Sequence, residues 1–236
     1  INGSDTIWQD IEIMYSGWTT RRTEQMGEPD DLPLSNNLNI LGPRTVMRRC
    51  IFHDLAGPGF WTPAIDGVLE ECISFNNGWS APDRGHGHGI YAQNLQGTKT
   101  IRRCAFMQGY SDYSIHCYAG MGGALQGFDI VENASLARTL IVGGNVPVDR
   151  TTLTRNVLFG GSLLTGYNPL VQNGGAALAG NILANGANHE TRGLWSNLTE
   201  TGTDATTGNR VLVYGSLVIV FNQAGAASVL APKAGR

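Results

Sequence analysis

The chain has 236 residues, of which 42% are hydrophobic, and a formal net charge of −3, so it can bury a sizeable core. The small net charge argues against nucleic acid or an anionic membrane surface as the main partner. The longest apolar run, 211–221, is broken by Tyr214, Gly215 and Ser216, so no membrane span is predicted. With 32 glycines and only 15% charged residues, the composition is typical of an all-β chain with many turns.

One short phrase recurs along the chain: an apolar residue, two usually polar residues, Cys or Asn, and a further apolar residue. Clear copies occupy 47–51, 69–73, 101–105, 130–134, 153–157 and 178–182, a weaker first copy occupies 7–11, and a degenerate last copy surrounds Asn209. From Cys50 onward the Cys/Asn positions are spaced by 22, 32, 29, 23 and 25 residues. This spacing is the period of a solenoid coil and does not fit a compact two-layer fold.

A second predicted strand follows each phrase. These strands are centred on Phe60, Ile90, Ile115, Leu140, Leu170 and Leu194. Alternation of side chains places these six residues in the core. Short strands, small turn residues and the lack of helical periodicity predict one β-solenoid domain, 1–236, of about seven to eight coils. A polar segment with two prolines, 17–37, is predicted to be a projecting loop of the kind that often borders binding sites.

These phrases and strands resemble the right-handed parallel β-helix repeat superfamily, the pectate-lyase-like group, over about residues 1–221. The resemblance implies a right-handed parallel β-helix and, for an enzyme, action on polysaccharides outside the cell. The resemblance does not identify a set of catalytic residues in this chain. The clustered calcium-binding aspartates of pectate lyases and the paired aspartates of polygalacturonases do not occur in the predicted outward columns. Where mannuronan epimerases carry Asp-Pro-His-Glu, the nearest string is DRGH at 83–86.

The residues just before the Cys/Asn positions alternate in sign. They are Arg49, Glu71, Arg103, Glu132 and Arg155. Equivalent residues on stacked coils lie ~4.8 Å apart, where opposite charges attract and like charges repel. The alternation therefore predicts a solvated surface ladder and not a polyanion-binding patch.

The Cys/Asn positions themselves predict one buried column. Its members are Cys50, Cys72, Cys104, Asn133, Asn156 and Asn181. Stacked Asn amides can bond along the coil axis, and Cys behaves there as a small apolar residue. Two alternatives stay open for the cysteines: free buried thiols, or a disulfide between neighbouring coils.

The most unusual local feature is an alternation of glycine and histidine, 85–89, at a predicted loop-to-strand junction. Stacking the second strands brings aromatic and hydrogen-bonding side chains into one outward patch near it. The patch contains Trp61, Tyr91, Gln93, His116 and Tyr118. Aromatic faces beside directed polar partners are what a sugar ring needs. We therefore predict that these residues bind a polysaccharide or oligosaccharide.

One position before the strands, His88, Tyr113 and Arg138 fall on consecutive predicted coils. A lyase or epimerase acting on a uronic acid needs a base for the proton next to the carboxylate, a cation, and an acid. We predict His88 as the base, Tyr113 as the acid and Arg138 as the clamp for the carboxylate. The predicted enzyme needs no cofactor.

Other interpretations of the same residues stay open. The glycine–histidine run can be a tight turn whose histidines bond backbone carbonyls, and the aromatic patch can be a protein interface. Asp83, His86 and His88 also form a possible divalent-metal set. The alternative function is therefore a non-catalytic, glycan-binding or filament-forming structural β-helix protein.

Two further expectations concern the ends of the chain and its location. The sequence opens in what looks like the middle of a structural element, as in a mature or trimmed product. No amphipathic helix is predicted to cap the core, and an uncapped solenoid favours end-to-end self-association. By resemblance to the β-helix group, the protein is expected to be secreted or attached to the cell surface.

Overall fold

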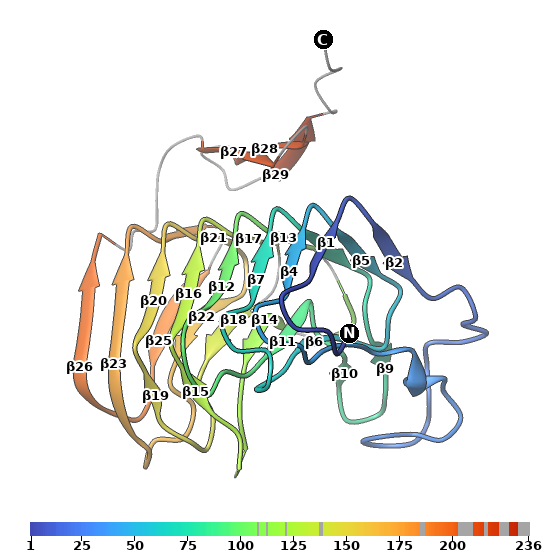
Figure 1. Ribbon diagram of the computed structural model, residues 1–236, viewed down its shortest axis with the longest axis horizontal. Helices are drawn as coiled ribbons and strands as arrows, with labels where there is room; N and C mark the ends of the chain where they lie inside the picture. The colour runs from blue at the N-terminus through green and yellow to red at the C-terminus, as the bar shows by residue number, and fades with distance from the viewer. Residues whose placement is uncertain are drawn as a thin grey trace.

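The computed structural model shows a parallel β-solenoid, in which strands of successive coils stack side by side from β1 to β26 (Figure 1). The structure describes residues 1–107, 109–111, 113–120, 122–136, 139–184, 187–202, 210–214, 217–221 and 227–230. Three parallel sheets form the walls, and most coils contribute one strand to each. The all-β solenoid prediction is confirmed. The degenerate repeat around Asn209 lies outside the described residues.

The first sheet contains β1 (Ile7–Gln9), β4 (Val46–Arg48), β7 (Val68–Glu70), β12 (Lys99–Arg102), β16 (Phe128–Val131), β20 (Thr151–Thr154), β23 (Gln172–Ala179) and β26 (Leu194–Thr201). The second sheet contains β2 (Glu12–Met14), β5 (Ile51–His53), β8 (Ile73–Phe75), β13 (Ala105–Phe106), β17 (Ala134–Leu136), β21 (Val157–Phe159) and β24 (Ile182–Ala184). The third sheet contains β3 (Leu38–Ile40), β6 (Pro58–Phe60), β11 (Ile90–Ala92), β14 (Tyr113–Cys117), β18 (Thr139–Val142), β22 (Ser162–Thr165) and β25 (Asn188–Thr191).

The remaining elements lie outside these three sheets. They are the antiparallel pair β9 (Trp79–Ser80) and β10 (Gly85–His86), the parallel pair β15 (Leu125–Gln126) and β19 (Val148–Asp149), a 3-10 helix η1 (Leu34–Asn36), and an antiparallel sheet of β27 (Arg210–Tyr214), β28 (Leu217–Phe221) and β29 (Ala227–Leu230). About six full turns separate the first and last of the seven stacked strands in the second and third sheets, close to the seven to eight coils predicted. Among the described residues, no helix is long and apolar enough to cross a membrane.

The core follows the predicted alternation in the first coils and departs from it in the last two. Phe60, Ile90, Ile115 and Leu140 are fully buried, as predicted. Leu170 and Leu194 were expected inside as well, but they are 85% and 57% exposed, so this part of the prediction is wrong. The third-sheet strands of these coils are instead β22 and β25, which pair with each other and continue the sheet from β18.

The Cys/Asn column is confirmed as a ladder of hydrogen bonds between coils. The Cys50 and Cys72 backbone N–H groups donate to the sulfur of the next cysteine, each at 3.4 Å. From Cys104 onward, each N–H donates to the Oδ1 of the next asparagine at 3.0 Å. All four cysteines of the chain are buried free thiols. The column therefore satisfies one buried donor per coil, which pins the axial register.

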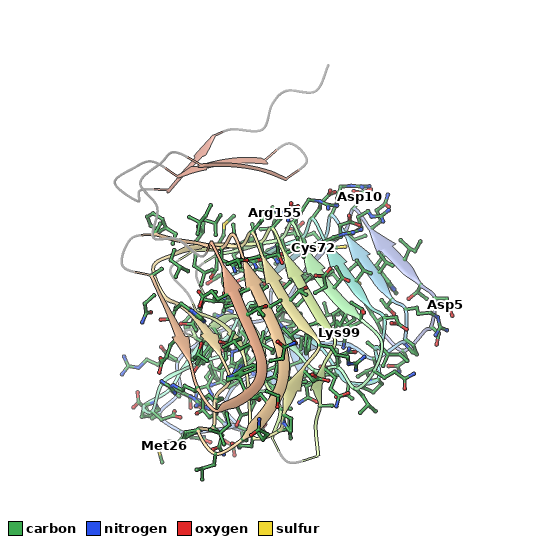
Figure 2. The ribbon with its side chains drawn as sticks, turned by 90° about the vertical axis from the view of Figure 1, so that its left-hand side faces the viewer. Asp5, Asp10, Met26, Cys72, Lys99 and Arg155 are labelled. Atoms are coloured by element: carbon green, nitrogen blue, oxygen red, sulfur yellow. The ribbon has the colours of Figure 1, made fainter. Side chains whose placement is uncertain are left out.

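The charge ladder is confirmed and extends one coil further than predicted. Arg103 pairs with Glu71 at 3.2 Å and Arg155 with Glu132 at 2.8 Å. Trp8 pairs with Met47, so the weak first copy is shifted by one residue and Asp10 joins the ladder opposite Arg49. Figure 2 labels Asp10 and Arg155, which lie along the same edge of the solenoid.

Backbone geometry explains where the ladder sits. Arg49, Glu71, Arg103, Glu132 and Arg155 all have φ between 50° and 57°. This left-handed conformation, which is unusual for residues other than glycine, makes the tight turn between the first and second sheets. The turn points each of these side chains away from the core, where the alternating charges meet.

Candidate functional site

A cavity of about 310 Å³ lies next to the predicted patch. It lies between the 17–37 loop, the end of β6, the β9–β10 hairpin and the start of β11. Its notable side chains are Glu28, Trp61, Trp79, Arg84, His88 and Tyr91. A cavity of this size fits a small ligand or part of a chain. Gly27 and Glu28 of the 17–37 loop line this cavity. That the loop borders a binding site stays a prediction.

The 17–37 loop is held against the solenoid by Arg21. The Arg21 guanidinium pairs with Asp54 at 2.7 Å and donates from Nε to the Gly78 carbonyl at 3.0 Å. It also lies against the rings of Trp18 and Tyr110, with 4.9 and 4.7 Å to their centroids. Only 10% of the side chain is exposed. This anchor fixes the loop that supplies one wall of the pocket.

The glycine–histidine run shapes the opposite wall. Gly87 has a φ of 79°, and a Cβ there would lie 2.4 Å from the Gly78 Cα, so only glycine fits this turn. His86, on one side of it, stacks on Trp79 with centroids 5.0 Å apart and bonds Asp83 at 3.1 Å. His88, on the other side, lines the pocket. Both histidines thus bond side chains and not the backbone carbonyls considered as an alternative.

The aromatic patch predicted from the sequence exists as a set of ring contacts. Tyr91 and His116 are direct partners in the register of β11 and β14, with ring centroids 5.1 Å apart. His116 stacks on Tyr118 at 5.1 Å. Trp61 is not aligned as predicted, because Tyr91 pairs with Gly59 instead. The Trp61 ring nevertheless reaches Tyr91, at 4.7 Å between centroids.

Gln93 supports the aromatic patch through hydrogen bonds to neighbouring coils. Its amide oxygen accepts from the Thr62 hydroxyl at 2.7 Å, and its amide nitrogen donates to the Tyr118 carbonyl at 3.2 Å. Both ends of the side chain are therefore engaged within the protein. The structure places Gln93 as a brace between neighbouring coils that carry the aromatic rings.

Lys99 is a second brace, which sequence reasoning missed. It is fully buried, and its ammonium donates to the carbonyl oxygens of Phe60 at 3.0 Å, Trp61 at 2.6 Å and Gln93. Burial lowers the pKa of Lys99 to about 7, whereas the three carbonyl acceptors favour its charged form. It fixes the backbone where Trp61 and Gln93 leave the third sheet.

A hydrogen-bonded chain joins the two histidines of the patch. The His88 Nε2 and His116 Nδ1 atoms are 3.1 Å apart, and His88 Nδ1 is 3.1 Å from the Ser111 hydroxyl. The Ser111 oxygen also accepts from the Tyr113 N–H at 3.1 Å. A cavity of about 10 Å³, lined by Ser111 and His88 among others, adjoins the chain. Such a space is about the smallest that holds one water molecule.

Electrostatics keep both imidazoles neutral near pH 7. Burial, with the positive charge of Arg84 as a further cause, lowers the pKa of His88 to about 3. Burial and the neighbouring His88 lower the pKa of His116 to about 2. A neutral pair fits the 3.1 Å contact, in which one ring donates its proton and the other accepts it.

Tyr113 joins the cluster through an irregularity in β14. The register slips between Tyr113 and Ile115, so Tyr113 pairs with Thr139 and not with the residue before it. This bulge turns Tyr113 to the same side as His116, and the two rings stack at 4.3 Å. The predicted third member, Arg138, lies outside the described residues.

Arg84 is the cation that the structure does place at the pocket. It lines the cavity beside His88, and 71% of its side chain is exposed. The signal in the sequence was its position directly before the glycine–histidine run. Among the described residues, no group of three or more His, Cys, Asp or Glu side chains is arranged to hold a metal ion.

The fold and the site together define a parallel β-helix protein with an aromatic, histidine-containing pocket over its third sheet. No family model, curated protein or solved structure matches the chain. Because a fold of this kind hosts many activities, the residues of the pocket carry the functional assignment.

Proposed function

We propose that this protein is an extracellular, carbohydrate-active β-helix protein that binds a uronic-acid-containing glycan and acts on it as a lyase or epimerase. One observation carries the proposal: a single pocket joins an aromatic surface, a neutral imidazole and a guanidinium. Trp61 and Tyr91 offer faces on which a sugar ring can stack. Arg84 offers two parallel N–H donors for the sugar carboxylate.

The chemistry starts with removal of the proton on the carbon next to the carboxylate. We assign the base to the His88–His116 pair, because a proton taken by one ring is shared through the bond between them. A bound carboxylate raises the pKa of a nearby imidazole, which makes the pair a better base when substrate is present.

Elimination and epimerisation differ in the step after this proton transfer. In elimination, the C–H electrons form a double bond, the C–O bond on the next carbon breaks, and the leaving oxygen takes a proton from the Tyr113 hydroxyl. In epimerisation, Tyr113 returns a proton to the opposite face of the same carbon. In both cases Arg84 stabilises the negative charge that develops on the carboxylate.

A non-catalytic glycan-binding role is the second candidate. The observation that favours it is that both ring nitrogens of His88 already have hydrogen-bond partners, Ser111 and His116. In that case the pocket binds the sugar through the same rings, and the imidazoles serve as rigid hydrogen-bonding groups.

A panel of polygalacturonate, polymannuronate and a neutral glucan tests the proposal. We expect calorimetric binding of at least one polyuronate and no binding of the glucan. Elimination is followed by the ultraviolet absorbance of the unsaturated product, and epimerisation by deuterium uptake from heavy water. Binding of a polyuronate without either product supports the second candidate. Binding of the glucan alone contradicts the first candidate, and no binding of any glycan in the panel contradicts both.

Two variants separate binding from chemistry. Trp61→Ala should weaken glycan binding with a smaller effect on turnover, because it removes a stacking face. Arg84→Ala should raise KM for the acidic glycan. Arg150→Ala is the matched control, since Arg150 is an exposed arginine that does not line this pocket. An equal effect of both arginine changes would remove the assigned role of Arg84.

A further inference from the structure

Ring contacts lead out of the pocket and along the solenoid without a break. The centroid distances are 4.7 Å from Trp61 to Tyr91, 5.1 Å from Tyr91 to His116 and 5.1 Å from His116 to Tyr118. A last contact of 5.3 Å joins Tyr118 to Tyr167. Trp61, Tyr91 and Tyr167 come from three different coils, and His116 and Tyr118 share a fourth, so this track runs along the solenoid axis.

The end of the track at Tyr167 combines an exposed ring with amide groups, which are the groups that bind sugars. Tyr167 is 38% exposed. Beside it, the Asn145 amide donates to the Tyr118 hydroxyl at 3.3 Å, and the Asn168 amide donates to the Asn145 side-chain oxygen at 3.3 Å. Each amide nitrogen has two hydrogens, so one remains on each for a ligand. An exposed ring next to amide donors matches what a sugar's face and hydroxyls require.

This end is separate from the pocket. Tyr167 follows β22, which is three strands along the third sheet from β11, where Tyr91 lies. Neighbouring strands are ~4.8 Å apart, so the two tyrosines are offset by ~14 Å along the axis. Neither Tyr167 nor the two asparagines line the 310 Å³ cavity. A single sugar ring does not span this offset, but a chain of several does.

We propose that Tyr167, Asn145 and Asn168 form a second sugar subsite, so that the ligand is an extended glycan chain lying along the solenoid axis. This inference rests on the proposed function, because it assumes that the pocket binds a sugar. It adds the requirement for chain length: an oligosaccharide that reaches Tyr167 binds more tightly than one that fills only the pocket.

The test is the dependence of affinity on chain length. Oligogalacturonates and oligomannuronates of two to eight sugars are titrated into the wild-type protein and into Tyr167→Ala by calorimetry. We expect the short oligomers to bind both proteins alike. The longest should bind Tyr167→Ala about tenfold more weakly, the loss expected for one stacking contact. Asn168→Ala should show a smaller loss, again only for long chains.

Leu170→Ala is the control, because Leu170 is an exposed neighbour in sequence that takes no part in the track. It should bind every oligomer like the wild type. Affinity that does not rise with length, or an equal loss at all lengths in Tyr167→Ala, overturns the subsite while leaving the pocket intact. Absence of binding by the wild type at every length overturns the proposed function and the subsite together.

Discussion

The histidine pair His88 and His116 and the single histidine His53 lie at different sheets of this solenoid, and their neighbours differ in charge. His88 and His116 lie over the third sheet among tyrosine rings, and they bond to each other. His53, at the end of β5 in the second sheet, lies between two carboxylates. Its Nδ1 is 2.6 Å from Asp54 and its Nε2 is 2.7 Å from Glu12.

The neighbours decide the charge of each group. Burial lowers the pKa of His88 and His116, and no carboxylate is among the causes that act on them. Burial alone would lower the pKa of His53 too, but the bonds to Asp54 and Glu12 outweigh it and raise that pKa. One group is thus neutral and suited to proton transfer. The other, His53, favours its charged form, and its bond to Asp54 helps to hold the carboxylate that pairs with Arg21, the anchor of the pocket wall.

The largest expected effect is on activity, and it comes from changing His88 in the neutral His88–His116 pair. His88→Ala should reduce turnover by ~10²–10⁴, the usual contribution of a general base, while glycan binding persists through Trp61 and Tyr91. His189→Ala is the control, because His189 lies on β25, away from the pocket. Product formation and calorimetric binding are measured on both. Wild-type turnover in His88→Ala would leave only the binding role.

The second-largest effect is expected on stability, at Arg21, which pairs with Asp54 beside His53. Arg21→Ala should lower the free energy of unfolding by about 2 kcal/mol, because it removes charged hydrogen bonds from a buried position. It should also raise KM, since the 17–37 loop is then less firmly held. Arg22→Ala is a matched control: its side chain is 78% exposed, and exposed ion pairs contribute little. Urea unfolding that fails to distinguish the two variants would contradict the anchor.

Opposite pH dependence distinguishes the two groups directly. In the unfolded chain His88 and His116 take up protons near pH 6.5, whereas in the folded protein their pKa values are about 3 and about 2. Both residues therefore lower the stability as the pH falls below about 6.5. His116→Phe should therefore reduce acid sensitivity. The groups facing this pair are Arg84, His86 and the tyrosines Tyr91, Tyr113 and Tyr118.

His53 should behave in the reverse sense. Its folded pKa is raised, so its contribution is present below about pH 6.5 and is lost as pH rises through the folded value. The stability difference between wild type and His53→Gln should shrink with increasing pH. Thermal unfolding of the wild type and both variants from pH 4 to pH 9 measures this. Parallel pH curves for the two histidine variants would show that the neighbours do not set the charges as argued.

The smallest effect concerns the charge ladder on the surface. Glu71→Arg places three arginines in a row, with Arg49 and Arg103, and should cost about 1 kcal/mol at low salt. Glu71→Gln removes the attraction without adding repulsion, so it should cost less. High salt should shrink the difference between the two variants. A difference that does not respond to salt would contradict the electrostatic origin of the ladder.

The sequence by itself determined the features that recur once per coil. The Cys50-to-Asn181 column and the Arg49-to-Arg155 ladder are read from spacing alone, because each position meets its equivalent on the next coil. The same argument placed Phe60 and Ile90 in the core and brought Tyr91 next to His116. It failed at Leu170, where periodicity does not distinguish the apolar segment at 162–165 from the one that follows it.

Only the tertiary structure decided contacts between positions that are not equivalent from coil to coil. Ser111 meets His88, and Arg21 meets Asp54, across loops whose paths depend on their own turns. Tyr113 turns toward His116 because of a bulge that has no periodic signature. The pocket arises in this way, since its walls come from a loop, a hairpin and a sheet edge that packing alone brings together.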